Sequence, residues 1–285
     1  MMEVSRFIKK IDQLVKINKP IIAFGLARPD KQIIESLKKA SKYARIILVG
    51  PRLIKKHSNF DVITDKDPEK KLAVLLAQDK VDGIVRGTLD SFKVYENYTK
   101  ITGEKYTIMP ALIEDSLGRI FFLEPISNPE GWSKEERLKI AKELANLVKE
   151  FGISPRIAVF SGEREGSYNQ KKDTKDGVTG ILNKTYEDAE WISKKIKQYG
   201  YNIKNYTIEL NLAIEDNYNI LIPVNGMVGN QLARIILSCG GRVMMIPRLG
   251  LSRCYEECSR TEKDFKNHVK WLVALINKKR KIRIK

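Results

Sequence analysis

The sequence predicts an α/β protein whose strands form a mostly parallel sheet. Two apolar runs, at residues 21–25 and 46–50, have the length of buried strands, and each closes on a glycine. Amphipathic helical patterns separate most of the apolar runs, and the alternation continues along most of the chain. Strands that alternate with helices form βαβ units, in which the strands run parallel. A chain of 285 residues has room for one large domain or two modest ones.

The first part of the chain is predicted to begin with an amphipathic helix at residues 5–17, which ends before Pro20. Pro68 is suited to the first turn of a later helix, because proline lacks the N–H that a first turn leaves unpaired. The predicted elements, in chain order, are a strand at 21–25, a helix at 31–42, strands at 46–50 and 62–63, a helix at 69–78, a strand at 83–85 and a helix from residue 90.

The middle of the chain is predicted to contain a hairpin and then a long helix. Residues 106–113 and 119–126 have strand patterns, and the turn residues 116–118 lie between them. Ser133 is predicted to cap the helix, and Glu136 completes a capping box three residues later. The hairpin offers an apolar surface that a second copy of the chain could cover.

The alternation of strands and helices resumes after Gly152, where the long helix is predicted to stop. Residues 161–180 interrupt it with a polar, glycine-rich segment that is predicted to be a loop. Loops of that length inside a compact domain are usually functional or mobile. The remaining predicted elements are a strand at 156–160, a helix at 186–199, a strand at 219–222, a helix at 228–238, a strand at 242–246 and a final helix at 262–277.

The charge of the chain is strongly positive. It contains 52 basic and 35 acidic residues, a formal net charge of +17 at pH 7. Such an excess attracts polyanions, phosphorylated metabolites, coenzyme A or an acidic protein partner. A lysine-rich composition that spreads charge over solvated helix faces explains it equally well. The basic tail at residues 278–285 is expected to fray and could contact an acidic partner. Nucleic-acid binding is not expected, because the sequence has no RNP motif and no aromatic stacking ladder.

Several other classes of protein are not expected from the sequence. No apolar run approaches the roughly 20 residues of a transmembrane helix, and the N-terminus lacks an apolar signal-peptide core, so a cytoplasmic protein is expected. Three cysteines, Cys239, Cys254 and Cys258, do not indicate a disulfide framework. The last two have only the distant His268 as a further ligand, so no metal site is expected. Both His268 and His57 are expected to be surface side chains.

Candidate ligand-binding residues follow the predicted strands, because ligands of open α/β sheets bind beyond the carboxyl ends of the strands. Residues 223–231 follow an apolar strand and open a helix, where backbone N–H groups would suit a phosphate or another anion. An ordinary strand-to-helix turn explains this segment equally well. No Walker A sequence, G-x-G-x-x-G fingerprint or G-x-S-x-G elbow occurs, so the common nucleotide-binding and hydrolase signals are absent. The other turns at this edge carry Gly25, Gly50, Arg86, Gly87, Ser161 and Gly162.

Five short segments occur along the chain in one characteristic order: DGIVRG at 82–87, NP at 128–129, FGISPRIAVFS at 151–161, NGMVGN at 225–230 and SR at 259–260. In this order the chain resembles the phosphate acetyl/butyryltransferase family over most of its length. Within that superfamily, the segments VRGTL at 85–89 and VNGMVGNQ at 224–231 are most similar to the MtxX branch. That branch is a methanogenesis marker described as a methyltransferase subunit.

The resemblance implies a two-domain fold like that of isocitrate and isopropylmalate dehydrogenases, with parallel-rich sheets and an inter-domain cleft. Residues 1–107 and 248–285 would form a discontinuous first domain. Residues 108–247 would form the second domain, which would supply one wall of the cleft and the interface of a homodimer. An archaeal, cytoplasmic protein is implied as well.

The resemblance also implies a ligand site in that cleft. Ser259 and Arg260 match the pair that binds the acyl phosphate and coenzyme A, and Ser259 is also a catalytic candidate. Asp264 is the candidate for the catalytic base, although it lies closer to Arg260 than the family pattern requires. A second phosphate-binding arginine is missing, with Asn97 near its place. The predicted ligand-binding residues are Arg86, Gly87, Ser161, Asn225, Gly226, Gly229, Asn230, Ser259 and Arg260.

We therefore expect a methyltransferase-related, transferase-like protein of methanogen one-carbon metabolism that binds a phosphate-bearing or other anionic ligand. One alternative is a phosphate acyltransferase or coenzyme A acyltransferase. The other is a non-catalytic accessory protein that docks on an acidic methanogenesis complex. No cofactor is assigned, although coenzyme A or another phosphorylated cofactor fits an anion site. The corrinoid-binding signature D-x-H-x-x-G does not occur in the sequence.

Overall fold

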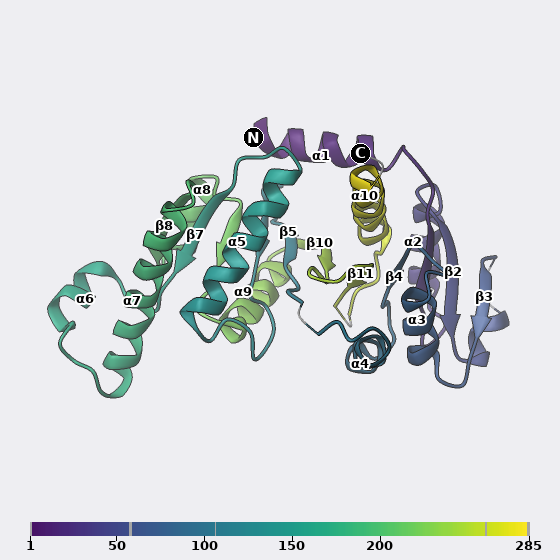
Figure 1. The fold of residues 1–285 in the computed structure, drawn as a ribbon, viewed down its shortest axis with the longest axis horizontal. Helices are drawn as coiled ribbons and strands as arrows, with labels where there is room; N and C mark the ends of the chain where they lie inside the picture. Colours follow the sequence, from purple (N-terminus) through teal and green to yellow (C-terminus); the bar gives the residue numbers. More distant parts are fainter. Residues whose placement is uncertain (1, 57–58, 106, 260, 284–285) are drawn as a thin grey trace. The chain divides into compact units, whose positions relative to one another are not determined.

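The computed structural model describes residues 2–56, 59–105, 107–259 and 261–283 (Figure 1). The chain divides into two compact units. The first unit comprises residues 8–107 and 244–285, and the second unit comprises residues 1–7 and 108–243. Helix α1 (Met2–Leu14) and strand β10 (Arg242–Pro247) cross the boundaries between them. Each unit is an α/β structure built on a mixed, mostly parallel sheet.

The sheet of the first unit has the strand order β3-β2-β1-β4-β11-β10, in which only β10 runs antiparallel to its neighbour. The final helix therefore belongs to the same unit as the first strands. The elements wholly within this unit are β1 (Ile21–Gly25), α2 (Lys31–Ala40), β2 (Arg45–Gly50), the 3-10 helix η1 (Arg52–Lys56), β3 (Asp61–Thr64), α3 (Pro68–Ala77), β4 (Gly83–Val85), α4 (Ser91–Thr102), β11 (Cys254–Glu257) and α10 (Lys266–Arg283).

The helices of the first unit cover the two faces of its sheet in pairs. Ala23 and Ile84 point into a core formed with α3 and α4, which pack against each other. The next residue of β1, Phe24, faces the other way and packs edge-on against Phe265, with the ring centroids 4.7 Å apart. Helix α10 covers this second face together with α2. Alternate side chains of a strand point to opposite faces, so each strand supplies both cores.

Three helices of the first unit begin at an aspartate that follows a strand. The Asp30 carboxylate accepts the N–H of Ile33 at 3.1 Å at the start of α2. Asp67 and Asp90 cap α3 and α4 in the same way, each accepting an N–H three residues later at 3.0 Å. Such caps satisfy N–H groups that the first turn leaves without a helical partner.

The sheet of the second unit has the strand order β5-β6-β9-β7-β8. Strands β5 and β6 form an antiparallel pair, and every other pair in this sheet is parallel. The elements of this unit are β5 (Ala111–Glu114), β6 (Ile120–Leu123), α5 (Lys134–Glu150), β7 (Arg156–Phe160), α6 (Glu165–Lys171), α7 (Gly177–Lys197), β8 (Asn202–Thr207), α8 (Leu210–Glu215), β9 (Ile220–Ile222) and α9 (Gly226–Ser238).

The predicted hairpin and the predicted capping of the long helix are confirmed. Strands β5 and β6 pair in antiparallel register from Ala111 with Leu123 to Glu114 with Ile120. The N–H of Glu136 donates to the Ser133 hydroxyl at 3.1 Å, so Ser133 is the cap of α5. Both features depend on residues close in sequence, which is why the local pattern identifies them.

The prediction of a loop at residues 161–180 is wrong. Helix α6 occupies part of it, and α7 begins at Gly177 rather than near residue 186. The Asn183 amide donates to the carbonyl oxygens of Lys171 and Thr174, at 2.7 and 3.0 Å, and so fixes the turn between the two helices. These two hydrogen bonds join α7 to the end of α6 and to the turn after it, so they leave no periodic signal in the sequence.

Strands β8 (Asn202–Thr207) and β11 and helix α8 are not predicted from the sequence, and the last helix begins later than predicted. Helix α10 begins at Lys266, because the preceding residues form a hydrogen-bonded loop. None of the described helices combines the length and the apolar character that crossing a membrane requires.

Gly87 makes a turn that a larger residue cannot make. Its φ is +62°, and an added Cβ would lie 2.0 Å from the Gly25 carbonyl oxygen and 2.8 Å from the Phe24 ring. We predict that Gly87→Ala lowers the free energy of unfolding by about 1 kcal/mol for left-handed backbone strain, and by about 2 kcal/mol more for the steric clash.

Gly103 provides the matched control for this prediction. Its φ is +75°, but an added Cβ would meet nothing within 4 Å. Gly103→Ala should therefore cost only the backbone strain, about 1 kcal/mol. Urea denaturation of both variants measures the difference, and equal costs would show that the contact between the Gly25 and Gly87 turns is not close.

Candidate functional site

The carboxyl ends of β1, β4 and β11 meet at one edge of the first unit. The Thr88 N–H donates to the Gly25 carbonyl oxygen at 2.9 Å, and the Thr88 hydroxyl accepts the N–H of Ala27 at 2.8 Å. On the other side of this turn, the Cys258 thiol donates to the Gly87 carbonyl oxygen at 3.0 Å. The predicted residues Arg86, Gly87 and Ser259 therefore lie in consecutive turns of one sheet edge.

Arg86 is buried beneath this edge, with 3% of its side chain exposed. Its Nε donates to Glu257 Oε1 at 2.5 Å, and Nη1 donates to the carbonyl oxygens of Gly87 and Leu89 at 2.8 and 3.2 Å. Its Nη2 donates to the Cys258 carbonyl oxygen. The guanidinium thus joins the turn after β4 to the turn after β11. Direct binding of an anion by Arg86 stays a prediction.

Glu257 accepts from a second buried arginine. Arg248 donates to Glu257 Oε2 through Nε at 3.1 Å and through Nη2 at 3.0 Å. The Arg248 guanidinium also lies 4.0 Å from the centre of the Tyr95 ring and 5.2 Å from that of Tyr255. One buried carboxylate therefore accepts from two guanidinium groups, and the faces of the two aromatic rings help to stabilise the positive charge of Arg248.

The opposite face of β11 carries a buried histidine between two glutamates. His268 is fully buried, its Nδ1 lies 2.7 Å from Glu256 Oε1, and its Nε2 lies 3.7 Å from Glu262 Oε2. The same Glu256 oxygen accepts the N–H of Ile246 at 2.7 Å. The expectation of a surface position for His268 is therefore wrong, and His57 lies outside the described residues.

The charges in this cluster shift the protonation of each member. Burial opposes the charged imidazolium, but the hydrogen bond to Glu256 and the negative charges of Glu256 and Glu262 outweigh it and raise the pKa of His268 to about 9. Burial raises the pKa of Glu256, although His268 opposes that rise. Burial acts in the same sense on Glu262, but its bonds to His268 and the backbone lower its pKa overall.

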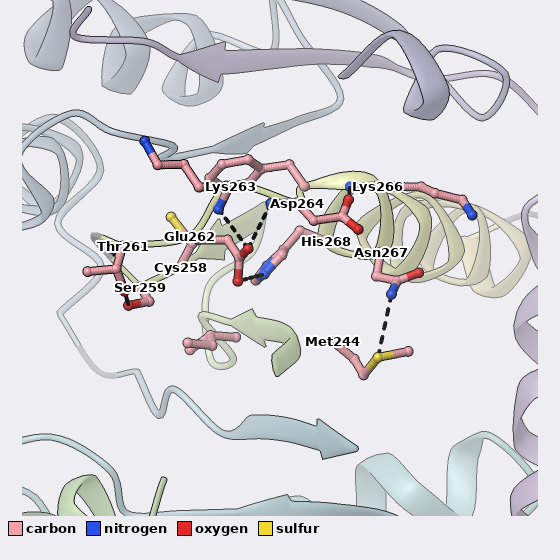
Figure 2. Close-up of polar contacts among 12 residues, drawn as sticks. Met244, Cys258, Ser259, Thr261, Glu262, Lys263, Asp264, Lys266, Asn267 and His268 are labelled. Atoms are coloured by element: carbon pink, nitrogen blue, oxygen red, sulfur yellow. Dashed lines mark hydrogen bonds and ion pairs between the residues drawn. The ribbon is translucent and has the colours of Figure 1, made fainter. Parts of the chain in front are cut away.

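Glu262 shapes the loop formed by residues 258–259 and 261–264, which we call the Ser259 loop. Its Oε1 accepts the N–H groups of Lys263 and Asp264, both at 2.8 Å, while its Oε2 faces His268 (Figure 2). The buried histidine thereby reaches the loop through one carboxylate. Both Glu262 oxygens are directed into the protein itself.

Asp264, the predicted base, caps the last helix in this structure. Its Oδ1 accepts the Ser36 hydroxyl at 2.8 Å and the N–H of Lys266 at 3.1 Å. The Ser36 hydroxyl in turn accepts the N–H of Phe265 at 2.7 Å, so α2 supplies part of the cap of α10. The pair of Asp264 and Ser36 joins the two helices on this face of the sheet. A catalytic role for Asp264 stays a prediction.

The remaining residues of the Ser259 loop have different environments. The Ser259 hydroxyl lies 3.0 Å from the Thr261 hydroxyl and accepts the N–H of Thr261 at 3.4 Å. Arg260 lies outside the described residues. Cys258 is buried, and burial raises the pKa of its thiol, so it is not a ready thiolate nucleophile. Across the described residues, no group of three or more His, Cys, Asp or Glu side chains is arranged to hold a metal ion.

The predicted residues of the second unit form a tightly packed turn. The Asn225 side chain caps α9 by accepting the N–H of Val228 at 3.0 Å, and the N–H of Gly226 donates to the Glu130 carbonyl oxygen at 2.8 Å. An added Cβ at Gly226 would lie 1.7 Å from the Ser127 carbonyl oxygen. The N-terminal N–H groups of Gly226 and Val228 thus bond to the protein itself.

The other predicted residues of this unit support the same packing. Gly229 lies against the Pro125 carbonyl oxygen, which an added Cβ would approach to 1.8 Å, and the Asn230 amide donates to the Ile126 carbonyl oxygen at 2.9 Å. Ser161 is buried after β7 and donates its hydroxyl proton to the Glu163 carbonyl oxygen at 2.9 Å. Close packing alone accounts for these contacts, and anion binding by these residues stays a prediction.

Sequence reasoning missed the two buried glutamates of β11 and the charged residues that surround them: Glu256, Glu257, Arg248, Glu262 and His268. One signal in the sequence was available. His268 lies among apolar residues of the last helix, and two adjacent glutamates follow Tyr255. Charged residues in such apolar surroundings are buried only when they are paired, so each of them calls for a partner.

No family model matches the chain. A protein of Methanosarcina barkeri named "Putative methyltransferase mtx subunit X" is 31% identical over 230 residues, which cover 79% of this chain and 82% of that protein. A protein of Methanosarcina mazei with the same name is 29% identical over 238 residues, 82% of each chain.

Solved structures with similar folds include two phosphotransacylases. A branched-chain phosphotransacylase from Enterococcus faecalis V583 has a TM-score of 0.64 and 15% identity, covering 90% of this chain and 99% of its own. A phosphotransacetylase from Streptococcus pyogenes has a TM-score of 0.67 and 12% identity, covering 97% and 99%. A 4-hydroxythreonine-4-phosphate dehydrogenase from Klebsiella pneumoniae has a TM-score of 0.59 and 11% identity, covering 91% and 100%. At these identities the likeness is one of fold alone.

The buried pair of Arg86 and Glu257 should be worth far more to stability than an exposed pair. We predict that Arg86→Leu lowers the free energy of unfolding by about 3–5 kcal/mol, because it removes one partner from a buried carboxylate. Arg45 and Asp61 form an exposed pair at 2.7 Å, and Arg45→Leu should cost less than about 1 kcal/mol. Chemical denaturation measures both costs, and a cost for Arg86→Leu as small as the control would contradict the buried cluster.

The raised pKa of His268 predicts a loss of stability at alkaline pH. Because the folded-state pKa of about 9 exceeds the ordinary value of 6.5, the contribution is complete below pH 6.5 and disappears as pH rises through 9. The loss should be on the order of 3 kcal/mol. Urea denaturation between pH 6.5 and pH 10 measures it, and His268→Gln should remove this part of the pH dependence.

A direct titration tests the same claim when the variant does not fold. The chain has two histidines, so NMR of the imidazole C–H groups can follow each one in the wild-type protein. One should titrate near pH 9. Two ordinary titrations near pH 6.5 would show that His268 does not carry its proton between the two glutamates.

Proposed function

The chain belongs to the family of mtx subunit X, and from this membership we propose that it is a methyltransferase-related transferase subunit that binds an anionic, phosphate-bearing ligand. The proposed place of action is methanogen one-carbon metabolism, as the family resemblance implies. The proposed ligand site is the carboxyl edge of the first unit, at the Gly87 turn and the Ser259 loop.

One observation carries this proposal: buried charge clusters on both faces of β11 hold the Ser259 loop beside the Gly87 turn. Arg86 donates to the carbonyl oxygens of Gly87 and Cys258, and Glu262 binds the loop N–H groups of Lys263 and Asp264. A loop fixed in this way loses little further freedom when a ligand binds, which is the benefit of preorganisation. We assign the contact with the anion to Ser259 and Arg260, and the positioning of their loop to Arg86.

The net charge of the chain supports an anionic ligand. A formal charge of +17 at pH 7 raises the local concentration of phosphates and of phosphorylated cofactors such as coenzyme A. Arginine suits such a ligand, because its planar fork of donors matches the oxygens of a phosphate. The two-domain, isocitrate dehydrogenase-like architecture, the homodimer and the cytoplasmic location remain proposals that accompany this function.

Phosphate acyl transfer is the second candidate. The fold likeness to two phosphotransacylases, at TM-scores of 0.64 and 0.67, favours it over unrelated transferase chemistries. Such an enzyme would release a free thiol from an acyl-coenzyme A when phosphate is supplied. The accessory role is the third candidate, and it would show as co-purification with an acidic complex at moderate salt without any turnover.

Substitution of Arg260 tests the proposed ligand site. We predict that Arg260→Ala weakens the binding of inorganic phosphate and of coenzyme A by about 1.5–3 kcal/mol, the value of a hydrogen bond to a charged group. Isothermal titration calorimetry measures both affinities. Arg45→Ala is the control, because it removes the same charge at the amino end of β2, where Arg45 pairs with Asp61.

The control should bind both ligands as the wild type does. Equal affinities for Arg260→Ala and the wild type would place the anion elsewhere. Failure of the wild type to bind either ligand would remove the proposed function itself.

A further inference from the structure

A pocket lies at the opposite end of the same strands from the Ser259 loop. It has a volume of about 260 Å³ and lies at the amino ends of β4 and β11. Asp82 immediately precedes β4, and Arg253 immediately precedes β11. The last turns of α10 supply another wall through Ile276, Lys279 and Arg280. All of these residues belong to the first unit.

Both carboxylates of the pocket already have a guanidinium partner. Arg253 donates from Nε and Nη2 to the two oxygens of Asp79, each at 2.8 Å. Arg280 Nη2 pairs with Asp82 Oδ1, and the other Asp82 oxygen accepts the N–H of Ile21 at 2.7 Å. The acidic side chains of the pocket are thus neutralised within the protein.

The third cation has a different environment. The Lys279 ammonium donates to the carbonyl oxygens of Leu251 and Ser252, at 3.1 and 3.4 Å. Among the described residues, no carboxylate forms an ion pair with it. Three cationic side chains and two carboxylates line the pocket, which leaves one positive charge without a counter-charge. Two carbonyl dipoles orient this ammonium but do not neutralise it.

The pocket also has an apolar side. Val81 and Ile276 line it, and an added Cβ at Gly83 would lie 3.0 Å from Ile276 Cδ1. The glycine at the start of β4 thus lets α10 approach the sheet closely here. The pocket combines a cationic rim with an apolar wall, and this pairing suits a ligand with one charged end and one short apolar end.

We propose that this pocket is a second binding site, separate from the proposed transferase site, for a small organic anion. A phosphate or carboxylate group would contact the Lys279 ammonium and Nη1 of Arg253, which in the structure donates to the Ser252 hydroxyl at 3.3 Å. A short apolar part of the same molecule would lie against Val81 and Ile276. Binding here involves no group transfer.

Phenyl phosphate and inorganic phosphate are the probes for this site. We expect phenyl phosphate to bind more tightly than inorganic phosphate, because the apolar wall adds a contact that the bare ion lacks. In an amide NMR titration, the resonances of Ser252, Arg253 and Cys254 should shift. Lys279→Met should weaken the binding of phenyl phosphate about tenfold, as expected for loss of one charge-assisted hydrogen bond.

Lys39→Met is the matched control, because Lys39 is an exposed lysine of α2 outside the pocket. It should leave the affinity unchanged at constant ionic strength. Equal weakening by both variants would show non-specific attraction to a basic surface and would overturn the proposal. The proposal also fails if neither probe shifts the amides of 252–254. Shifts confined to the Ser259 loop would contradict this second site while leaving the proposed function intact.

Discussion

The carboxylate of Glu257 is the constraint on which the edge of the first unit depends. It is buried at the end of a four-residue strand and accepts from Arg86 on one side and from Arg248 on the other. Removing ions from water costs several kcal/mol each, so such a cluster is stable only when the remaining donors also find acceptors. Arg86 meets this condition with three backbone carbonyl oxygens, and those contacts fix the turns on either side of it.

Each face of β11 carries a buried glutamate that is paired with cationic side chains, but the cationic groups differ. Glu257 faces two arginines, whereas Glu256 faces a histidine whose protonated form the surrounding carboxylates stabilise. Through Glu262 the second cluster reaches the Ser259 loop, and through the carbonyl of Cys258 the first cluster reaches it as well. The buried charge clusters therefore order the loop above them, and this loop is part of the proposed ligand site.

The sequence was sufficient where structure depends on neighbours in the chain. The alternation of strands and helices, the hairpin and the Ser133 cap follow from local patterns. It was insufficient for β11, whose sequence Cys-Tyr-Glu-Glu has no strand periodicity and whose two glutamates are buried in pairs with Arg86, Arg248 and His268.

The sequence likewise identified some parts of the candidate site and not others. The turn glycines and the Ser259 loop could be identified from motifs and from a family resemblance. Arg86 could not be identified as the group that holds them in place, since its partner Glu257 lies 171 residues away along the chain. His268 was expected at the surface although it lies in the core, because periodicity does not show that Glu256, 12 residues earlier on β11, packs against its ring.

Native-state hydrogen exchange of β11 and its neighbours tests the central claim most directly. The N–H of Arg86 donates to the Glu256 carbonyl oxygen, and the N–H of Ile246 donates to the Glu256 carboxylate. If the two charge clusters hold this strand, both amides should exchange only through global unfolding, and the amides of Lys263 and Asp264 should be protected with them. Exchange of these amides as fast as in exposed helix ends would show that β11 opens locally, and that the clusters do not order the Ser259 loop.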